Sequence, residues 1–274
     1  MLRKLMKHEL RATGRVMLPL FLLVLITAAG ANLATRTLLE ADNKLMNLMG
    51  IILLTAFIIA IAAACIMAFA LMIQRFYKNL LQDEGYVMMT LPVSVHKHVW
   101  SKLLVSLLWY AASFIVVASA FFILMFDIEL AKEIAGAFNG ILQQMKELFP
   151  NGEIVHIIIA VLELVVLCVV SIAANCLEFY AAMSIGQSFA NRKILMSVLV
   201  YFGINFIMQI LGGVFGIIVD KNGLPFSVTN YLDTLSVPVT IHVVMAGLLL
   251  FTLVLSLIFY FISTYFLKNK LNLE

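Results

Sequence analysis

The chain has 274 residues, of which 64% are hydrophobic and only 12% are charged, and its mean hydropathy is +1.07. A soluble domain of average composition has about 45–50% apolar and about 25% charged residues, so this composition excludes an ordinary soluble domain, a disordered chain and a disulfide scaffold. This composition leaves too little polar surface to coat a soluble core, so we expect a lipid bilayer around most of the molecule. The net charge of +3 indicates little as a total, and no nucleic acid is expected as a partner.

A helix needs about 20 apolar residues to cross a hydrocarbon core about 30 Å thick. Six runs in the sequence are long enough, which predicts an all-α polytopic membrane protein with six transmembrane helices in a single domain. In chain order, the runs are residues 16–35, 45–74, 103–126, 154–191, 194–219 and 234–267, and only the fourth carries charges, at Glu163 and Glu178.

Basic residues are distributed unequally between the two sides of these spans. The segments that share a side with both termini hold thirteen Lys and Arg residues, and the opposite segments hold five. The positive-inside rule therefore predicts that both termini lie in the cytoplasm.

Residues 1–14 have the pattern of a separate amphipathic helix. Leu2, Leu5 and Leu10 share one face, and Lys4 and Lys7 lie on the other. A basic amphipathic helix that leads into a span is expected to lie in the inner membrane interface. We consider it unlike a cleaved signal peptide because its charges belong to this helix.

Three segments between the spans are expected to have a structure of their own. Residues 75–94 are a charged and aromatic cytoplasmic segment. Residues 127–153 place apolar side chains at helical spacing, which predicts an amphipathic helix on the outer leaflet. Residues 220–238 combine turn residues with aromatic ones and could re-enter the membrane from outside, provided that protein buries their backbone.

Motifs for catalysis and cofactor binding are absent from the sequence. It has no phosphate-binding G-x-x-x-x-G-K-[ST] loop, no H-E-x-x-H pair and no nucleophile elbow. We therefore expect no enzyme activity, no catalytic residue, no metal and no cofactor on this chain. His96, His98, His156 and His242 have no acidic or Cys companions at ligand spacing and are interpreted as interfacial residues.

Glu163 and Glu178 form a candidate intramembrane polar site. They lie fifteen residues apart in one span, or about 22 Å along a helix, so both cannot be at the bilayer midplane. Each could serve a proton relay or attract a cation, or could simply be an interfacial or paired carboxylate. The second interpretation is favoured, because a charge within a span costs only about 2.5–3.5 kcal/mol on insertion scales.

Small residues recur every four positions in two spans, where they allow helices to approach closely. They are Ala56, Ala60, Ala64 and Ala68 in the second span, and Gly212 and Gly216 in the fifth. The pattern predicts helix packing, either within the bundle or across a dimer interface.

The cytoplasmic segment carries the most specific pattern. Its motifs are Arg75-Phe-Tyr-Lys-Asn79, Asp83-Glu-Gly-Tyr86, Thr90-Leu-Pro-Val-Ser94 and Ser101-Lys-Leu-Leu104. Together they resemble the linker between the second and third spans of small bacterial ABC transporter permeases of the type-2 exporter superfamily. The six spans and the turn at Ser184-Ile-Gly-Gln187 are also similar to that family.

The resemblance implies that two permease subunits, identical or paralogous, each work with a cytoplasmic ATPase subunit that binds ATP and Mg²⁺. Residues 75–86 would be a coupling helix seated in a groove of the ATPase, with Glu84 as the charged contact. Gly85 would end this helix, Pro92 would extend the chain, and Ser94 would cap the third span. The full set of implied interface residues is Arg75, Phe76, Tyr77, Lys78, Leu80, Asp83, Glu84, Gly85, Tyr86, Pro92 and Ser94.

A docking surface is also favoured over a solvated loop because this short segment carries many apolar residues rimmed by charge. The resulting hypothesis is the permease subunit of an ATP-driven exporter of hydrophobic or amphipathic peptides, lipids or drugs. One alternative is a membrane protein that transports nothing, such as an immunity factor or a sensor scaffold. A less favoured alternative is an ion-coupled secondary transporter, for which the sequence lacks clear internal repeats.

Overall fold

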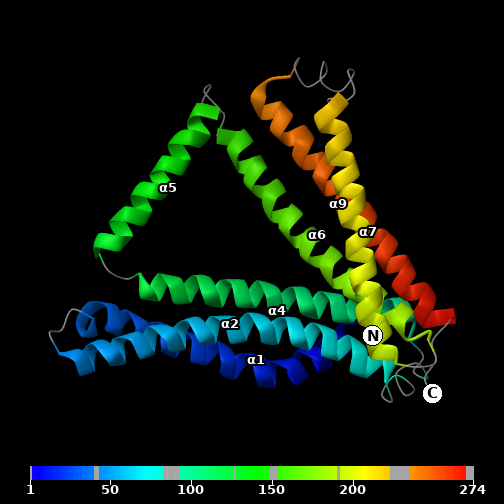
Figure 1. The fold of residues 1–274 in the computed structure, drawn as a ribbon, viewed down its shortest axis with the longest axis horizontal. Coiled ribbons are helices and arrows are strands. Elements are labelled where there is room, and N and C mark those ends of the chain that lie inside the picture. The colour runs from blue at the N-terminus through cyan, green and yellow to red at the C-terminus, as the bar shows by residue number, and fades with distance from the viewer. Residues whose placement is uncertain are drawn as a thin grey trace. The chain divides into compact units, whose positions relative to one another are not determined.

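The computed structural model describes residues 2–39, 43–82, 85, 90, 93–125, 128–148, 154–189, 192–222 and 235–269, and its regular elements are helices. In chain order they are α1 (Leu2–Leu33), its π-helical continuation η1 (Ala34–Leu38), α2 (Lys44–Leu81), α4 (Val95–Leu124), α5 (Ile128–Leu148), α6 (Ile154–Gly186), α7 (Lys193–Asn222) and α9 (Val237–Asn269) (Figure 1).

Six of these helices, all except α5, are long and apolar enough to cross a membrane. The prediction of an all-α, multi-pass membrane protein with six spans is therefore confirmed. The helix predicted within residues 127–153 is α5, and three of its apolar side chains, Ile134, Phe138 and Ile141, are exposed. The segment expected to re-enter the membrane, residues 220–238, joins the end of α7 to the start of α9 and lies mostly outside the described residues.

The first helix corrects one prediction. Residues 2–14 are not a separate helix, because α1 continues without a break to Leu33. The predicted faces are nevertheless present, since Lys4 and Lys7 are exposed whereas Leu5 and Leu10 are partly buried. The amphipathic segment is thus the first part of the first span.

The chain divides into two compact units. The first unit comprises residues Met1–Phe76 and His96–Gly140, and its helices α1, α2 and α4 run side by side (Figure 1). Their apolar core has few large side chains, so the three helices can approach closely. It consists of Val24, Ala28 and Ala31 from α1, Phe57, Ala60 and Ala64 from α2, and Ala120 from α4.

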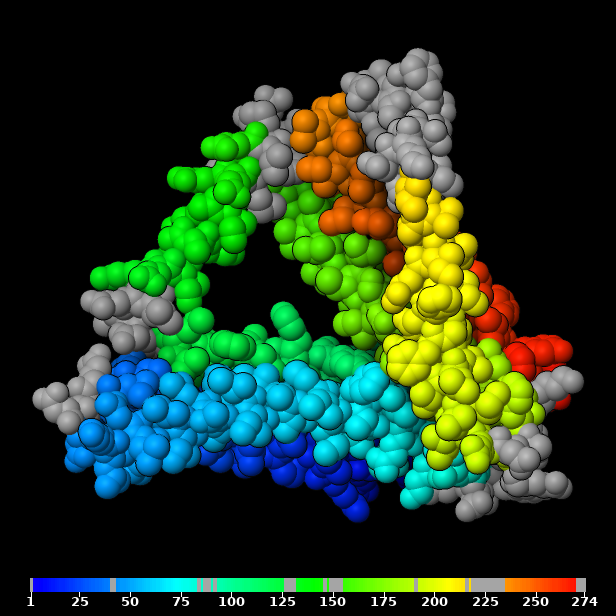
Figure 2. All heavy atoms as spheres, viewed as in Figure 1, coloured from blue at the N-terminus to red at the C-terminus, as the bar shows by residue number. Residues whose placement is uncertain are grey.

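A second apolar cluster in this unit lies one or two turns nearer the start of α1 and the end of α2. Met17 and Phe21 of α1 pack there with Ala68 and Leu71 of α2. Trp109 of α4 packs against this cluster, and its ring centroid is 5.9 Å from that of Phe21. In the space-filling view, the side chains of α2 form a continuous strip beside those of α4 (Figure 2).

The second unit comprises residues Tyr77–Val95 and Ile141–Glu274, where α6 packs against both α7 and α9. The rings of Phe179 on α6 and Tyr201 on α7 stack with centroids 4.3 Å apart. Gly186, the last residue of α6, lies so close to Ser197 of α7 that an added Cβ would collide with its side chain and backbone. A glycine at this position therefore allows α6 and α7 to meet.

Candidate functional site

The predicted coupling segment begins within α2 and differs from the expected exposed surface. Phe76, Leu80 and Leu81 are almost fully buried by the chain itself. The argument that these apolar side chains are exposed for a partner is therefore wrong.

The charged residues of this segment have a different environment. Lys78 is exposed, and Arg75 and Tyr77 are partly exposed. The predicted residues Asp83, Glu84, Tyr86 and Pro92 lie outside the described part of the chain. A helix end was expected at Gly85, but α2 stops at Leu81. The amide of Gly85 donates a 2.7 Å hydrogen bond to the carbonyl of Gln82. Ser94 directly precedes α4, the position where a capping residue belongs.

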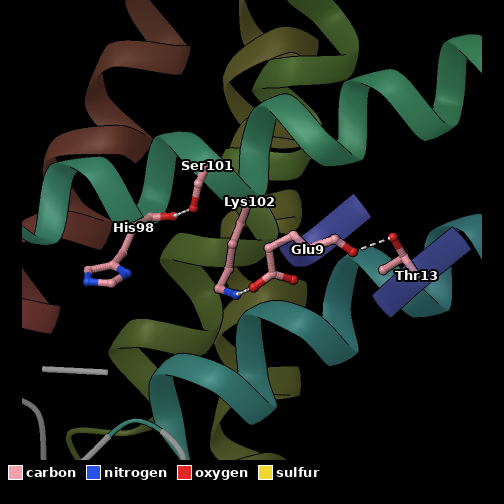
Figure 3. A network of polar contacts seen from close by, with 5 residues as sticks. All are labelled: Glu9, Thr13, His98, Ser101 and Lys102. Carbon is pink, nitrogen blue, oxygen red and sulfur yellow. Dashed lines mark hydrogen bonds and ion pairs between the residues drawn. The ribbon is translucent and has the colours of Figure 1, made fainter. Parts of the chain in front are cut away.

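A buried polar network joins α1 to α4 near the charged ends of these helices (Figure 3). Lys102 donates from Nζ to Oε1 of Glu9 at 2.6 Å, and the two side chains are only 2% and 8% exposed. The Thr13 hydroxyl donates to the carbonyl of Glu9 at 2.8 Å, and it accepts a 2.7 Å hydrogen bond from Nε1 of Trp109. The sequence analysis missed this network, because its members lie more than ninety residues apart.

Arg75 of the predicted coupling segment shares a small pocket with this network. The cavity has a volume of about 10 Å³, close to the space that one water molecule needs. Its polar walls are Glu9, Thr13, Lys102 and Ser106, with Arg75 entering from α2. Side chains of α2 and the ion pair between α1 and α4 thus line the same cavity.

His98 precedes Lys102 by one turn of α4, and its ring lies apart from the ion pair (Figure 3). The side chain is 1% exposed, and within the described residues neither ring nitrogen has a hydrogen-bond partner. His96, two positions earlier, is exposed.

Glu163, His242 and His156 form a hydrogen-bonded chain between α6 and α9. Nδ1 of His242 lies 2.8 Å from Oε2 of Glu163, and Nε2 of His242 lies 3.1 Å from Nδ1 of His156. The two imidazole rings have centroids 5.3 Å apart. The interpretation of both histidines as residues without acidic companions is therefore wrong, because Glu163 is such a companion.

Glu178 has a separate environment deeper in the second unit. Its Oε1 accepts a 2.6 Å hydrogen bond from Nδ2 of Asn205, which also donates to the carbonyl of Tyr201 on its own helix. The structure therefore pairs each of the two carboxylates of α6 with a different helix. It does not bring Glu163 and Glu178 together.

The small-residue stripes have two different outcomes. Ala60, Ala64 and Ala68 are buried inside the first unit, whereas Ala56 is partly exposed, so this stripe packs within the chain. A Cβ added to Gly212 would meet no atom within 4 Å in the described chain, so Gly212 does not pack closely within the chain, and its packing across a dimer interface stays a prediction. Gly216 lies in α7, but its surroundings lie outside the description.

No protein-family model, no curated protein and no solved structure matches this chain. Among the described residues, no three His, Cys, Asp or Glu side chains are grouped to hold a metal ion. The functional proposal therefore rests on the residues and helices of this chain.

Proposed function

We propose that this multi-pass protein is the permease subunit of an ATP-driven exporter in a bacterial cell membrane, with both termini in the cytoplasm. A separate cytoplasmic ATPase subunit binds ATP and Mg²⁺, and a second permease subunit completes the pathway. Hydrophobic or amphipathic peptides, lipids or drugs are the proposed cargo, because the spans are rich in apolar side chains. The chain itself is proposed to have no enzyme activity.

The length of α2 is the observation that carries this proposal. Its 38 residues form a helix about 57 Å long, nearly twice the thickness of a hydrocarbon core of about 30 Å. An average tilt of about 20° shortens its projection by only a few ångström. The end that carries Arg75 and Lys78 therefore extends beyond the hydrocarbon core, on the side where basic residues are concentrated.

The burial of Phe76, Leu80 and Leu81 gives this extension a mechanical role. A partner that pushes on the residues after Leu81 would move α2 as a rigid body, because its end cannot slide freely over its own chain. In this version of the coupling mechanism, the ATPase contacts Lys78 and the segment with Asp83 and Glu84. The apolar residues transmit the motion and do not form the docking surface.

Co-purification with an ATPase subunit tests the proposal. The full chain is expressed with the ABC ATPase subunits of its own genome, and bound ATPase and stimulated ATP hydrolysis are measured. Glu84→Lys is expected to weaken both at least tenfold, because it reverses a charge at the proposed contact. Glu133→Lys, at an exposed carboxylate on α5, is the control and is expected to leave both unchanged.

Two results would contradict the proposal. If no ATPase subunit binds, the chain is not an ABC permease. If an ATPase binds but Glu84→Lys changes neither binding nor hydrolysis, the coupling segment is assigned wrongly.

A proton-coupled secondary transporter is the second candidate, and the hydrogen-bonded chain of Glu163, His242 and His156 favours it. Titratable groups inside transmembrane helices are typical of proton pathways. Transport into proteoliposomes under a pH gradient without ATP would support this candidate over the exporter.

A further inference from the structure

The first turns of α1 carry their opposite charges on opposite sides of the helix. Glu9 is the one acidic residue among the first fifteen, and its Oε1 is buried 2.6 Å from Nζ of Lys102 on α4 (Figure 3). At about 100° per residue, every Lys and Arg of this stretch lies within about 60° of the direction opposite Glu9. All of them are exposed, and they are Arg3, Lys4, Lys7, Arg11 and Arg15.

Contacts with α4 fix the direction of this basic face. Beyond the Glu9 ion pair, Thr13 accepts a 2.7 Å hydrogen bond from Nε1 of Trp109, and Met17 lies in the buried cluster that Trp109 packs against. The helix thus runs along α4 from Glu9 onward and does not turn to lie flat across the helix ends. Because α1 is one helix from Leu2, the residues before Glu9 continue along the same axis.

The basic face is longer than the headgroup layer of a bilayer, which is about 5–8 Å thick on each side. The first uncharged run begins directly after Arg15. A hydrocarbon core that begins there has Arg11 about 6 Å from its edge, within the headgroup layer. Arg3 and Lys4 are about 16–18 Å from that edge, which is about 10 Å beyond the headgroups.

The basic face is unfavourable for an isolated helix. Lys7, Arg11 and Arg15 follow one another at a spacing of four, where neighbouring like charges repel. A phosphate group between two such side chains offsets the repulsion. A guanidinium group also presents a planar pair of N–H donors that matches the oxygens of a phosphate. Arg11 and Arg15, with Cβ atoms about 6 Å apart, can therefore contact the same phosphate.

We propose that Arg11 and Arg15 form a binding site for the phosphate of an anionic phospholipid at the start of the first span. Lys7, one turn before Arg11, adds electrostatic attraction. Lipid is the partner because both guanidinium groups lie at the level of the headgroups, where basic side chains attract anionic lipids over zwitterionic ones. This inference requires that α1 crosses the membrane, and it is independent of the exporter proposal.

Native mass spectrometry of the full chain, purified in detergent, tests the site. It measures the affinity for added phosphatidylglycerol, which is anionic, and for phosphatidylcholine, which is zwitterionic. The wild type is expected to bind phosphatidylglycerol about tenfold more tightly or better. Equal affinity for the two lipids would overturn the proposal. Inorganic phosphate equimolar with the lipid is the competitor, and displacement of the lipid would overturn it too, because a free anion would then occupy the site.

Two double variants remove the same number of charges at different levels. Arg11→Gln with Arg15→Gln is expected to lower the affinity for phosphatidylglycerol about tenfold or more. Arg3→Gln with Lys4→Gln is the matched control. It should lower this affinity by less than about threefold, because both residues lie more than a screening length of about 8 Å from the headgroups. Equal losses in the two proteins would overturn the site, since only the total charge would then matter.

A third double variant keeps the charge and changes its geometry. Arg11→Lys with Arg15→Lys preserves the basic residues that orient the span, so it should fold and insert like the wild type. Its affinity for phosphatidylglycerol is expected to fall about threefold, because an ammonium group lacks the paired donors of a guanidinium group. An unchanged affinity would overturn the proposal that the two guanidinium groups share a phosphate.

Discussion

The ammonium group of Lys102 lies 2.6 Å from the carboxylate of Glu9, and both side chains are almost completely buried. This ion pair joins the first helix to the third span across 93 positions of sequence. It also lines the small pocket that Arg75 of α2 lines, so residues of α1, α2 and α4 meet around this cavity.

Loss of one member of this pair should be severe. Lys102→Met removes the ammonium group that pairs with the buried Glu9 carboxylate, and breaking a buried pair costs about 3–5 kcal/mol. We expect that loss in reversible unfolding of the purified protein in detergent. Lys97→Met, which removes an exposed charge one turn away, is the control and should change the free energy of unfolding by less than about 0.5 kcal/mol.

The double variant Glu9→Leu with Lys102→Met makes the prediction sharper. Replacing both members of a buried ion pair by apolar residues of similar volume is often neutral, so the double variant should recover most of the lost stability. If the double variant is as unstable as Lys102→Met alone, packing of the two long side chains contributes more to the free energy of unfolding than their charge pairing does.

The side-chain amide of Asn32 donates 3.0 Å hydrogen bonds to the carbonyls of Ile123 and Leu124 at the end of α4. Asn32→Leu should destabilise the protein by about 1 kcal/mol, because these carbonyls lose a donor. Asn175→Leu is the matched control, since Asn175 donates only to Ser171 on its own helix. Equal unfolding temperatures for the two variants would contradict the proposed contribution of the contact between helices.

The close approach of α6 and α7 predicts that Gly186→Ala is destabilising. The added Cβ collides with Ser197, and such overpacking typically costs about 1–3 kcal/mol. Gly203→Ala on α7 has no atom within 4 Å of its added Cβ and should be neutral or stabilising, because alanine favours helix. Thermal unfolding of both variants measures the difference, and a stable Gly186→Ala protein would show that the two helices can separate at this point without cost.

The alanine core of the first unit gives a further prediction. Ala64→Leu should prevent folding or reduce stability by more than about 2 kcal/mol, because Ala64 is completely buried between helices. Ala62→Leu, two positions away on the exposed side of α2, should be tolerated. If Ala64→Leu instead leaves the monomer stable and abolishes a dimer, the stripe serves association between subunits.

The hydropathy pattern predicts the six spans because lipid requires long apolar helices, and no other property is needed. It predicts helix ends less well. For example, α4 begins at Val95, eight residues before the uncharged run at Leu103. Lys97 and Lys102 interrupt the uncharged run, but lysine favours helix formation, so the helix includes both residues.

Contacts between distant residues could not be predicted from hydropathy. The pairing of Glu9 with Lys102 depends on how each helix rotates about its axis, which packing decides. The site at His242 had a clue that the sequence analysis did not use. His156 and Glu163 are seven positions apart and therefore share a face of α6, and His242 begins a span on the same predicted side.

The alanines at the centre of the first unit have a consequence for how this protein can change over evolutionary time. Where three helical backbones approach to the distance that a methyl group permits, the only tolerated replacements are residues of nearly the same size, such as glycine or serine. Related chains should therefore vary freely in the side chains that face lipid and keep residues of this size at positions 28, 31, 60, 64 and 120. A distant relative could then be recognised by the spacing of its smallest residues even when its larger residues have all been replaced.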